Sequence, residues 1–158
     1  MTAILAGRTS RWHYQPRGTL IAQQLGAPVA QQPSEPDPRL TPGDTLAVYP
    51  AQLCVTGYSR SVRNLSPELK RAVYAEYGIA SHTPGEYEVD HLVSLELGGS
   101  NEIANLWPEL ASPTPGFHQK DQVENYLHDQ VCSGAISLSD AQVEIATNWL
   151  SVYQRMPK

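Results

Sequence analysis

The residues of this sequence that are best suited to chemistry begin with an adjacent acid and imidazole, Asp90 and His91. A carboxylate is a hard metal ligand. An imidazole has a pKa of about 6.5 when unperturbed, so it can act as a base or as a ligand. Neighbouring residues on a strand point to opposite faces, but twist or a bulge at a strand end can direct both into one cleft. An isolated pair of this kind is more often an exposed aspartate beside a hydrogen-bonded histidine, so the flanking residues must decide between the two interpretations.

Turn-forming and amide residues follow the pair. Gly98 and Gly99 permit a tight turn with positive φ, and Asn101 and Asn105 can hold loops through hydrogen bonds to the backbone. A second histidine, His118, lies at the start of a predicted helix, where it either supplies a neutral imidazole to a metal ion or faces solvent. Each of these features is weak alone, and their order along the chain is what carries information.

That order resembles the HNH nuclease family, whose core is the ββα-metal motif. The positions that match are Asp90-His91, Gly98-Gly99 with Asn101, Asn105-Leu106, and His118. The resemblance is confined to residues 89–120 and implies a metal-dependent endonuclease that hydrolyses phosphodiester bonds. His91 would then be the general base that takes a proton from water, and Asn105 would hold the loop between the two strands. Asp90 and His118 would be the metal ligands.

The same resemblance implies one divalent ion. Mg²⁺ or Mn²⁺ is expected, and Zn²⁺ or Ni²⁺ is also compatible because one ligand is an imidazole nitrogen. DNA is the expected substrate, with RNA as a second candidate. Lys120 follows at family-like spacing and can contact phosphate, as can Arg60 and Arg63 in the densest basic stretch of the chain. The alternative for these three side chains is a solvated surface.

The charge balance is unusual for a nuclease. The chain has 11 Lys and Arg against 16 Asp and Glu, a formal net charge of −5. This argues against a protein that coats nucleic acid non-specifically, because such binding depends on many Lys and Arg contacts to phosphates. A rival interpretation is therefore a catalytically inactive ββα-fold module that binds nucleic acid or a protein partner. An accidental match in a small exported structural protein is a third, and the sequence indicates no oligomeric state.

The chain has two cysteines, Cys54 and Cys132, and neither belongs to a CxxC pair. Many HNH domains bind a structural zinc ion through two CxxC pairs, so this chain needs another means of bracing its core. The two cysteines are either one disulfide that closes a long loop or two buried thiols of a cytosolic protein.

The expected elements give an α+β fold: a ββα-metal hairpin and helix, packed with additional N- and C-terminal helices. Ser66-Pro67-Glu68 predicts a helix start, with Ser66 as the cap. The later elements are strand 87–95, a short strand 105–107 stopped by Pro108, helix 117–131 with Val123, Leu127 and Val131 inward, and a helix from Ser137 or Ser139 with Val143, Ala146, Leu150 and Tyr153 inward and Trp149 beside them.

Two regions are predicted along the chain. Residues 1–45 read as a leader and a Pro-rich linker, and residues 46–158 as the nuclease domain. Residues 1–30 combine arginines, a short apolar stretch and small residues before Ala30, which resembles a poor signal peptide. We therefore expect a secreted or periplasmic protein rather than a cytoplasmic one, the alternative being a disordered leader. No stretch reaches the length of a membrane span.

Overall fold

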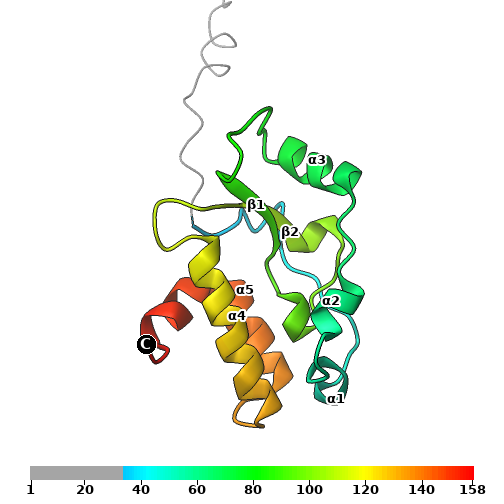
Figure 1. Ribbon diagram of the computed structural model, residues 1–158, viewed down its shortest axis with the longest axis vertical. Coiled ribbons are helices and arrows are strands. Elements are labelled where there is room, and N and C mark those ends of the chain that lie inside the picture. The colour runs from blue at the N-terminus through cyan, green and yellow to red at the C-terminus, as the bar shows by residue number, and fades with distance from the viewer. Residues whose placement is uncertain (1–33) are drawn as a thin grey trace, which may run out of the picture. The chain divides into compact units, whose positions relative to one another are not determined.

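The computed structural model describes residues 34–158 as a mixture of helices and one two-stranded antiparallel sheet, which confirms the predicted α+β class (Figure 1). The elements in chain order are α1 (Pro50–Leu53), α2 (Tyr58–Val62), α3 (Pro67–Glu76), β1 (Tyr87–His91), η1 (Leu95–Leu97), η2 (Ile103–Asn105), β2 (Leu106–Leu110), α4 (Phe117–Cys132) and α5 (Leu138–Arg155). No helix among the described residues is long and apolar enough to cross a membrane.

The sheet is a hairpin in which β1 and β2 pair from Tyr87 opposite Leu110 to His91 opposite Leu106. The prediction that Pro108 stops the second strand is wrong, because β2 continues through it to Leu110. Each strand of a two-stranded sheet has one edge without a partner, and proline is tolerated there because its missing amide hydrogen breaks no ladder bond. The first strand is shorter than predicted and ends at His91.

Helix α3 begins where its capping residues predict. The Ser66 hydroxyl accepts a hydrogen bond from the Leu69 amide at 3.1 Å, and Pro67 occupies the first turn. The helix buries Val73 against Val89 of β1 and Leu106 of β2. This small apolar cluster fixes α3 against one face of the hairpin.

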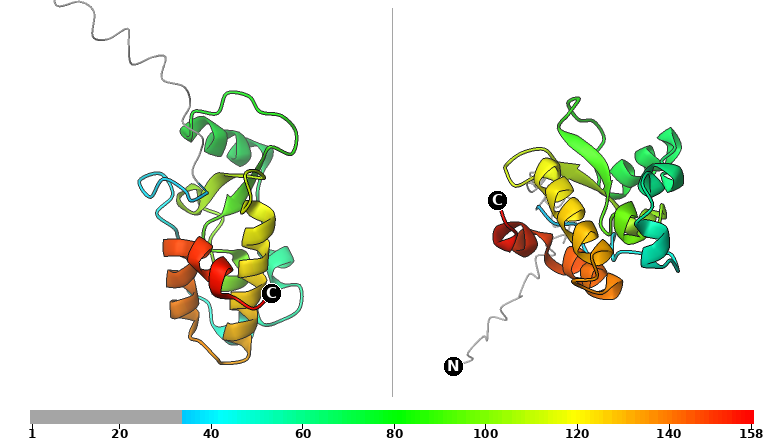
Figure 2. Two further views of the ribbon diagram at one scale, coloured as in Figure 1. Left: turned by 90° about the vertical axis from the view of Figure 1, so that its left-hand side faces the viewer. Right: turned by 60° about the horizontal axis from the view of Figure 1, so that its bottom comes forward.

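Helices α4 and α5 form an antiparallel pair that carries the larger core (Figure 2). The inward positions predicted for α4 are confirmed, since Val123, Leu127 and Val131 are all buried. The predicted start of α5 is also confirmed, because the Ser137 hydroxyl accepts a hydrogen bond from the Asp140 amide. α5 kinks at Asn148, whose φ and ψ are −167° and 72°.

The predicted inward face of α5 is displaced by part of a turn. Val143 is 60% exposed, and the fully buried positions are Ala141, Ile145, Trp149 and Val152. The other predicted residues, Ala146, Leu150 and Tyr153, are partly buried against the same core. α5 carries two sets of apolar residues at helical spacing, and only contact with α4 decides which one is buried.

The segment 34–45, predicted as a linker, is instead packed onto the domain. The Trp149 indole donates to the Ser34 carbonyl at 3.0 Å, and the buried Thr41 hydroxyl donates to the Leu106 carbonyl at 2.9 Å. The Gly43 amide donates to the Ala104 carbonyl. The polar backbone of this Pro-rich stretch therefore has partners inside the fold, and the predicted boundary at residue 46 is too late. The predicted leader at residues 1–30 lies outside the described residues.

A disulfide joins Cys54, directly after α1, to Cys132, the last residue of α4. The two Cα atoms are 5.7 Å apart and the bridged residues are separated by 78 positions in sequence. Of the two alternatives for the cysteines, the structure has the disulfide, and it links the N-terminal helices to the larger core.

Candidate functional site

The two faces of the hairpin meet different surroundings. Side chains alternate along a strand, so Val89 points to α3 and Asp90 points to α4. His91 lies on the same side as Val89, while Glu109 shares the side of Asp90. The adjacent Asp90 and His91 therefore meet different partners and do not converge on one cleft.

A lysine from α4 is buried against the Asp90 side of the hairpin. The Lys120 ammonium donates to Asp90 Oδ2 at 2.6 Å, to the His91 carbonyl at 2.7 Å and to Glu124 Oε1 at 2.5 Å. Burial alone would lower the pKa of Lys120, but Asp90 and Glu124 outweigh it and raise the pKa. Burial likewise acts to raise the pKa of Asp90, and Lys120 reverses this to a net decrease. Asp90 and Lys120 are thus a charged pair.

The location of Lys120 bears on its predicted contact with phosphate. Its side chain is 0% exposed and its three ammonium hydrogens have three oxygen partners. In this structure it presents no charge to a ligand at the surface, and its charge is used inside the fold.

Two further carboxylates surround this pair. Glu109 is 1% exposed, and neither of its oxygens accepts a hydrogen bond from the described residues. When protonated, the Glu109 carboxyl can donate a hydrogen bond to Asp90, which helps to raise the pKa of Glu109 and to lower that of Asp90. Burial raises the pKa of Glu109 to about 10, although Lys120 partly opposes it. Burial also raises the pKa of Glu124 to about 8. If all three were ionised, Asp90, Glu109 and Glu124 would exceed the charge of Lys120 by two. Glu109, which has the higher pKa of the two glutamates, instead retains its proton at neutral pH.

His91 is enclosed on the other side of the hairpin and is 1% exposed. Its Nε2 lies 3.2 Å from the side-chain oxygen of Asn101, and an amide oxygen only accepts, so Nε2 carries the hydrogen. Nδ1 then holds the lone pair, and it has no hydrogen-bond partner among the residues that the structure describes. Burial lowers the pKa of His91 to about 4, partly opposed by Asp90 and reinforced by Arg63. The imidazole is therefore neutral at neutral pH.

Asn101 is itself held in one orientation. Its side-chain nitrogen donates to the Val62 carbonyl at 2.9 Å, and its oxygen accepts from the Asn64 amide at 3.0 Å. These two contacts fix which end of the amide faces His91. The segment between α2 and α3, which includes Arg63, thereby sets the tautomer of the imidazole.

Asn105 holds the loop between the strands, the place that the resemblance gave it. Its side-chain oxygen accepts from the Val93 amide, and its nitrogen donates to the carbonyls of Val93 and Ser100, each at 2.9 Å. The same loop requires glycine at position 99, because a Cβ there would lie 1.7 Å from the Val93 carbonyl oxygen. Asn105 is buried and does not meet solvent.

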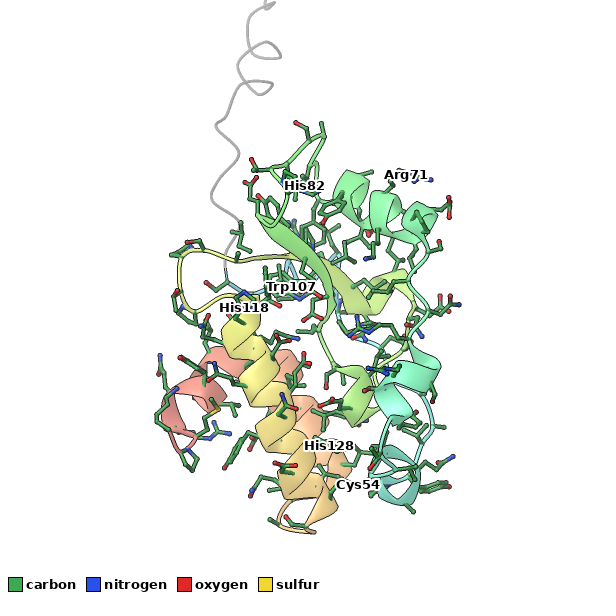
Figure 3. All side chains as sticks on the ribbon, in the orientation of Figure 1. Cys54, Arg71, His82, Trp107, His118 and His128 are labelled. Atoms are coloured by element: carbon green, nitrogen blue, oxygen red, sulfur yellow. A yellow bond between two sulfur atoms is a disulfide. The ribbon has the colours of Figure 1, made fainter. Side chains whose placement is uncertain are left out.

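The remaining predicted residues lie at the surface. His118 is exposed in the first turn of α4, where its ring packs against Phe117 at 4.3 Å between centroids. Its side chain forms no hydrogen bond or ion pair in the described part of the chain, so it is not joined to Asp90. Arg60 and Arg63 are exposed at α2, and their side chains form no ion pair within residues 34–158. Figure 3 shows His118 and His128 at opposite ends of α4.

Two residues of this site, Glu109 and Glu124, and the contact of Asn101 with His91 were not predicted from the sequence. The predicted end of the strand at Pro108 excluded Glu109, which the two-residue alternation from Trp107 would otherwise have placed beside Asp90. The spacing of four between Lys120 and Glu124 was a usable signal for a helical ion pair. Asn101 was recognised as a loop residue, but its contact with His91 depends on a segment 37 positions away.

No protein-family model, curated protein or solved structure matches this chain.

Proposed function

We propose that this protein is a metal-dependent endonuclease that hydrolyses phosphodiester bonds of DNA or RNA, with His91 as the general base. One observation carries the proposal: a neutral imidazole is oriented through Nε2, and its Nδ1 lone pair has no hydrogen-bond partner within residues 34–158. The carboxylate of the preceding residue, Asp90, lies on the opposite face of the hairpin but is near enough to oppose the fall in the imidazole's pKa. The order of hairpin and helix around it, β1, β2 and α4, supports a ββα-metal core.

The role of His91 follows from its environment. A base must be unprotonated before it can take a proton from water, and burial keeps this imidazole neutral at every pH well above 4. Asn101 restrains the ring, which lowers the cost of orienting it during the reaction. Because the ring is enclosed, water and phosphate reach Nδ1 only after neighbouring side chains move.

The carboxylates fit a hard divalent cation. Asp90 and Glu109 lie on one face of the hairpin, Glu109 accepts no hydrogen bond within residues 34–158, and the fully ionised cluster carries two uncompensated negative charges. Mg²⁺ and Mn²⁺ prefer oxygen ligands of this kind, and such an ion, when bound, would act as a Lewis acid on the phosphate. We therefore propose Asp90 with Glu109 as ligands, and His118 remains a proposed ligand that must turn toward them.

The substrate would meet the exposed arginines beside this region. Arg63 lies close enough to His91 to influence its pKa, and Arg60 precedes it on α2. A guanidinium here can bind a phosphate in two-point fashion. We propose that these two arginines orient the nucleic-acid strand and that Lys120 holds the carboxylates of Asp90 and Glu124 in place.

The test is cleavage of supercoiled plasmid and of single-stranded RNA by the full-length protein, with Mg²⁺, with Mn²⁺ and with EDTA. His91→Ala should lower a metal-dependent rate by roughly 100-fold or more, since general bases contribute about 10²–10⁴-fold. His82→Ala is the matched control, because His82 is exposed and lies before the hairpin. A folded His91→Ala protein with full activity would refute the assignment.

The second candidate function is a catalytically inactive module that binds nucleic acid or a protein partner. The enclosure of His91 at 1% exposure and the pairing of Asp90 with Lys120 favour it. A folded wild-type protein that binds either nucleic acid but cleaves neither with any ion would select this function.

A further inference from the structure

A second group of potential metal ligands lies at the far end of α4 from the hairpin. Cys54, His128 and Cys132 offer one ligand atom each, and these atoms all lie within 4.8 Å of one another. Of the residues described, they are the only three histidine, cysteine or acidic side chains that meet in this way. Figure 3 shows Cys54 beside His128.

One pair of these atoms, His128 Nε2 and Cys132 Sγ, already has the spacing of tetrahedral coordination. His128 and Cys132 are four residues apart on α4, so their side chains lie on one face, and His128 Nε2 is 3.4 Å from Cys132 Sγ. Zinc bonds of about 2.3 Å to sulfur and about 2.0 Å to nitrogen at the tetrahedral angle place S and N about 3.5 Å apart. This edge of the site needs almost no movement.

The disulfide prevents these residues from binding a metal ion. In the structure the two sulfur atoms are bonded to each other, so neither can act as a thiolate. Both cysteines are exposed, which gives a reductant access. The Cα atoms are 5.7 Å apart, and contacts of α1 with α4, including the buried Leu53 beside Cys54, remain when the bond is reduced, so the released sulfurs stay close enough to share one ion.

We propose that, after reduction of the disulfide, Cys54, His128 and Cys132 bind one zinc ion. An external dithiol supplies two electrons and two protons, its own sulfurs form a disulfide, and Cys54 and Cys132 become thiols. Binding of zinc releases both thiol protons and leaves two thiolates and one imidazole as ligands. The ion then links the end of α1 to α4 in place of the disulfide, so one brace serves oxidising and reducing surroundings.

Two features around His128 suit this role. Its Nε2 lies 3.3 Å from the Leu53 carbonyl, so a small rotation brings the nitrogen from the carbonyl to an ion beside the sulfurs. Its Nδ1 lies 4.0 Å from a carboxylate oxygen of the exposed Asp129, so a rotation of the Asp129 side chain is needed before the two form a hydrogen bond. A carboxylate on the second nitrogen orients ligand histidines and makes them more basic. Three protein ligands leave the fourth position to water.

The experiment compares zinc binding by the oxidised and reduced full-length protein. The reduced form is prepared with a phosphine, which takes oxygen from water, and is desalted under nitrogen. Bound zinc is measured by competition with a coloured chelator, and cobalt is added to a parallel sample. The reduced protein should bind one more equivalent of zinc than the oxidised protein, and its cobalt form should show the strong visible bands of tetrahedral thiolate coordination.

Three variants locate the site. His128→Ala should weaken the binding of the additional zinc ion by at least about tenfold, because loss of even an outer-shell partner lowers metal affinity by about 10–100-fold. His82→Ala should leave it unchanged. Cys54→Ser with Cys132→Ser should bind no additional zinc, and zinc should not raise its Tm, whereas zinc should raise the Tm of the reduced wild type. Equal zinc binding by both redox forms, or by reduced wild type and His128→Ala, would overturn the proposal. None of these readouts depends on nuclease activity.

Discussion

The two ends of α4 bury very different chemistry. At its N-terminal end, the polar hairpin site formed by Asp90, Glu109, Lys120 and Glu124 holds ionisable groups away from solvent. At its C-terminal end, the disulfide end, α4 buries Leu127 and Val131 against α5 and is linked by Cys132 to Cys54. Burying charged groups at the N-terminal end of α4 costs desolvation free energy, whereas burying apolar groups at its C-terminal end is favourable.

The difference separates stability from function. Buried apolar residues and a disulfide stabilise a small domain directly. A buried ion pair stabilises little relative to well-packed apolar residues of similar volume, and removing one partner is costly. Because the polar hairpin site adds little stability that apolar side chains could not supply, its presence supports a role in chemistry.

The largest effect should come from removing the buried ammonium. Lys120→Met keeps the length of the side chain but leaves Asp90 and Glu124 without their counter-charge. We expect a loss of roughly 3–5 kcal/mol in the free energy of unfolding, measured by urea denaturation. Lys70→Met, at an exposed position of α3, is the control and should change stability by less than about 0.5 kcal/mol. If both variants lost the same small amount, Lys120 would not be the buried partner of these carboxylates.

The second largest loss of stability should come from removing the disulfide. Replacing both cysteines, Cys54→Ser with Cys132→Ser, should lower the free energy of unfolding by about 2–4 kcal/mol, because the unfolded chain is no longer constrained. The measurement is made in EDTA, so that no metal substitutes for the bond. The Asp90–Lys120 pair should be intact in this variant, so any metal-dependent cleavage should survive at temperatures where the protein stays folded. Loss of cleavage in the folded variant would show that the two ends are not independent.

How far the sequence predicts this molecule depends on the range of the interactions. Capping by Ser66 and Ser137 and the inward positions of α4 were predictable because they involve neighbours within a turn or two. The loop contacts of Asn105 span only 12 positions and accompany a recognisable motif.

What escaped prediction rests on distant contacts. Lysine is almost never fully buried, and Lys120 is buried only because Asp90, 30 positions away, is brought beside it. The choice between the two apolar faces of α5 depends on α4. The packing of residues 34–45 also depends on contacts such as Thr41 with Leu106, 65 positions apart, which Pro-rich composition cannot reveal.

A pH-dependent effect should distinguish Glu109 from the groups around it. The folded protein keeps a proton on Glu109 up to about pH 10, whereas the unfolded chain releases it near the ordinary value of 4.5. Stability from this proton is full below pH 4.5 and is lost as the pH rises toward 10. Glu109→Gln removes this dependence. Between pH 6.5 and 7.5 the variant should gain up to about 1.4 kcal/mol relative to wild type, measured by urea denaturation in EDTA. Parallel pH profiles of the two proteins would mean that Glu109 titrates normally.

The smallest effect concerns the orientation of His91. Asn101→Asp keeps the shape of the side chain and the acceptor oxygen at His91, but adds a negative charge beside the imidazole. An adjacent carboxylate favours the protonated ring, so the pKa of His91 should rise from about 4, by roughly one unit. The titration is followed by NMR of the histidine ring protons, with His82 as the internal reference. If Asn101 orients the base, the acid limb of any cleavage activity should move to higher pH together with this pKa. An unchanged pKa of His91 in the folded variant would show that Asn101 does not contact the imidazole. The assignment of the lone pair to Nδ1, which rests on that contact, would then be lost.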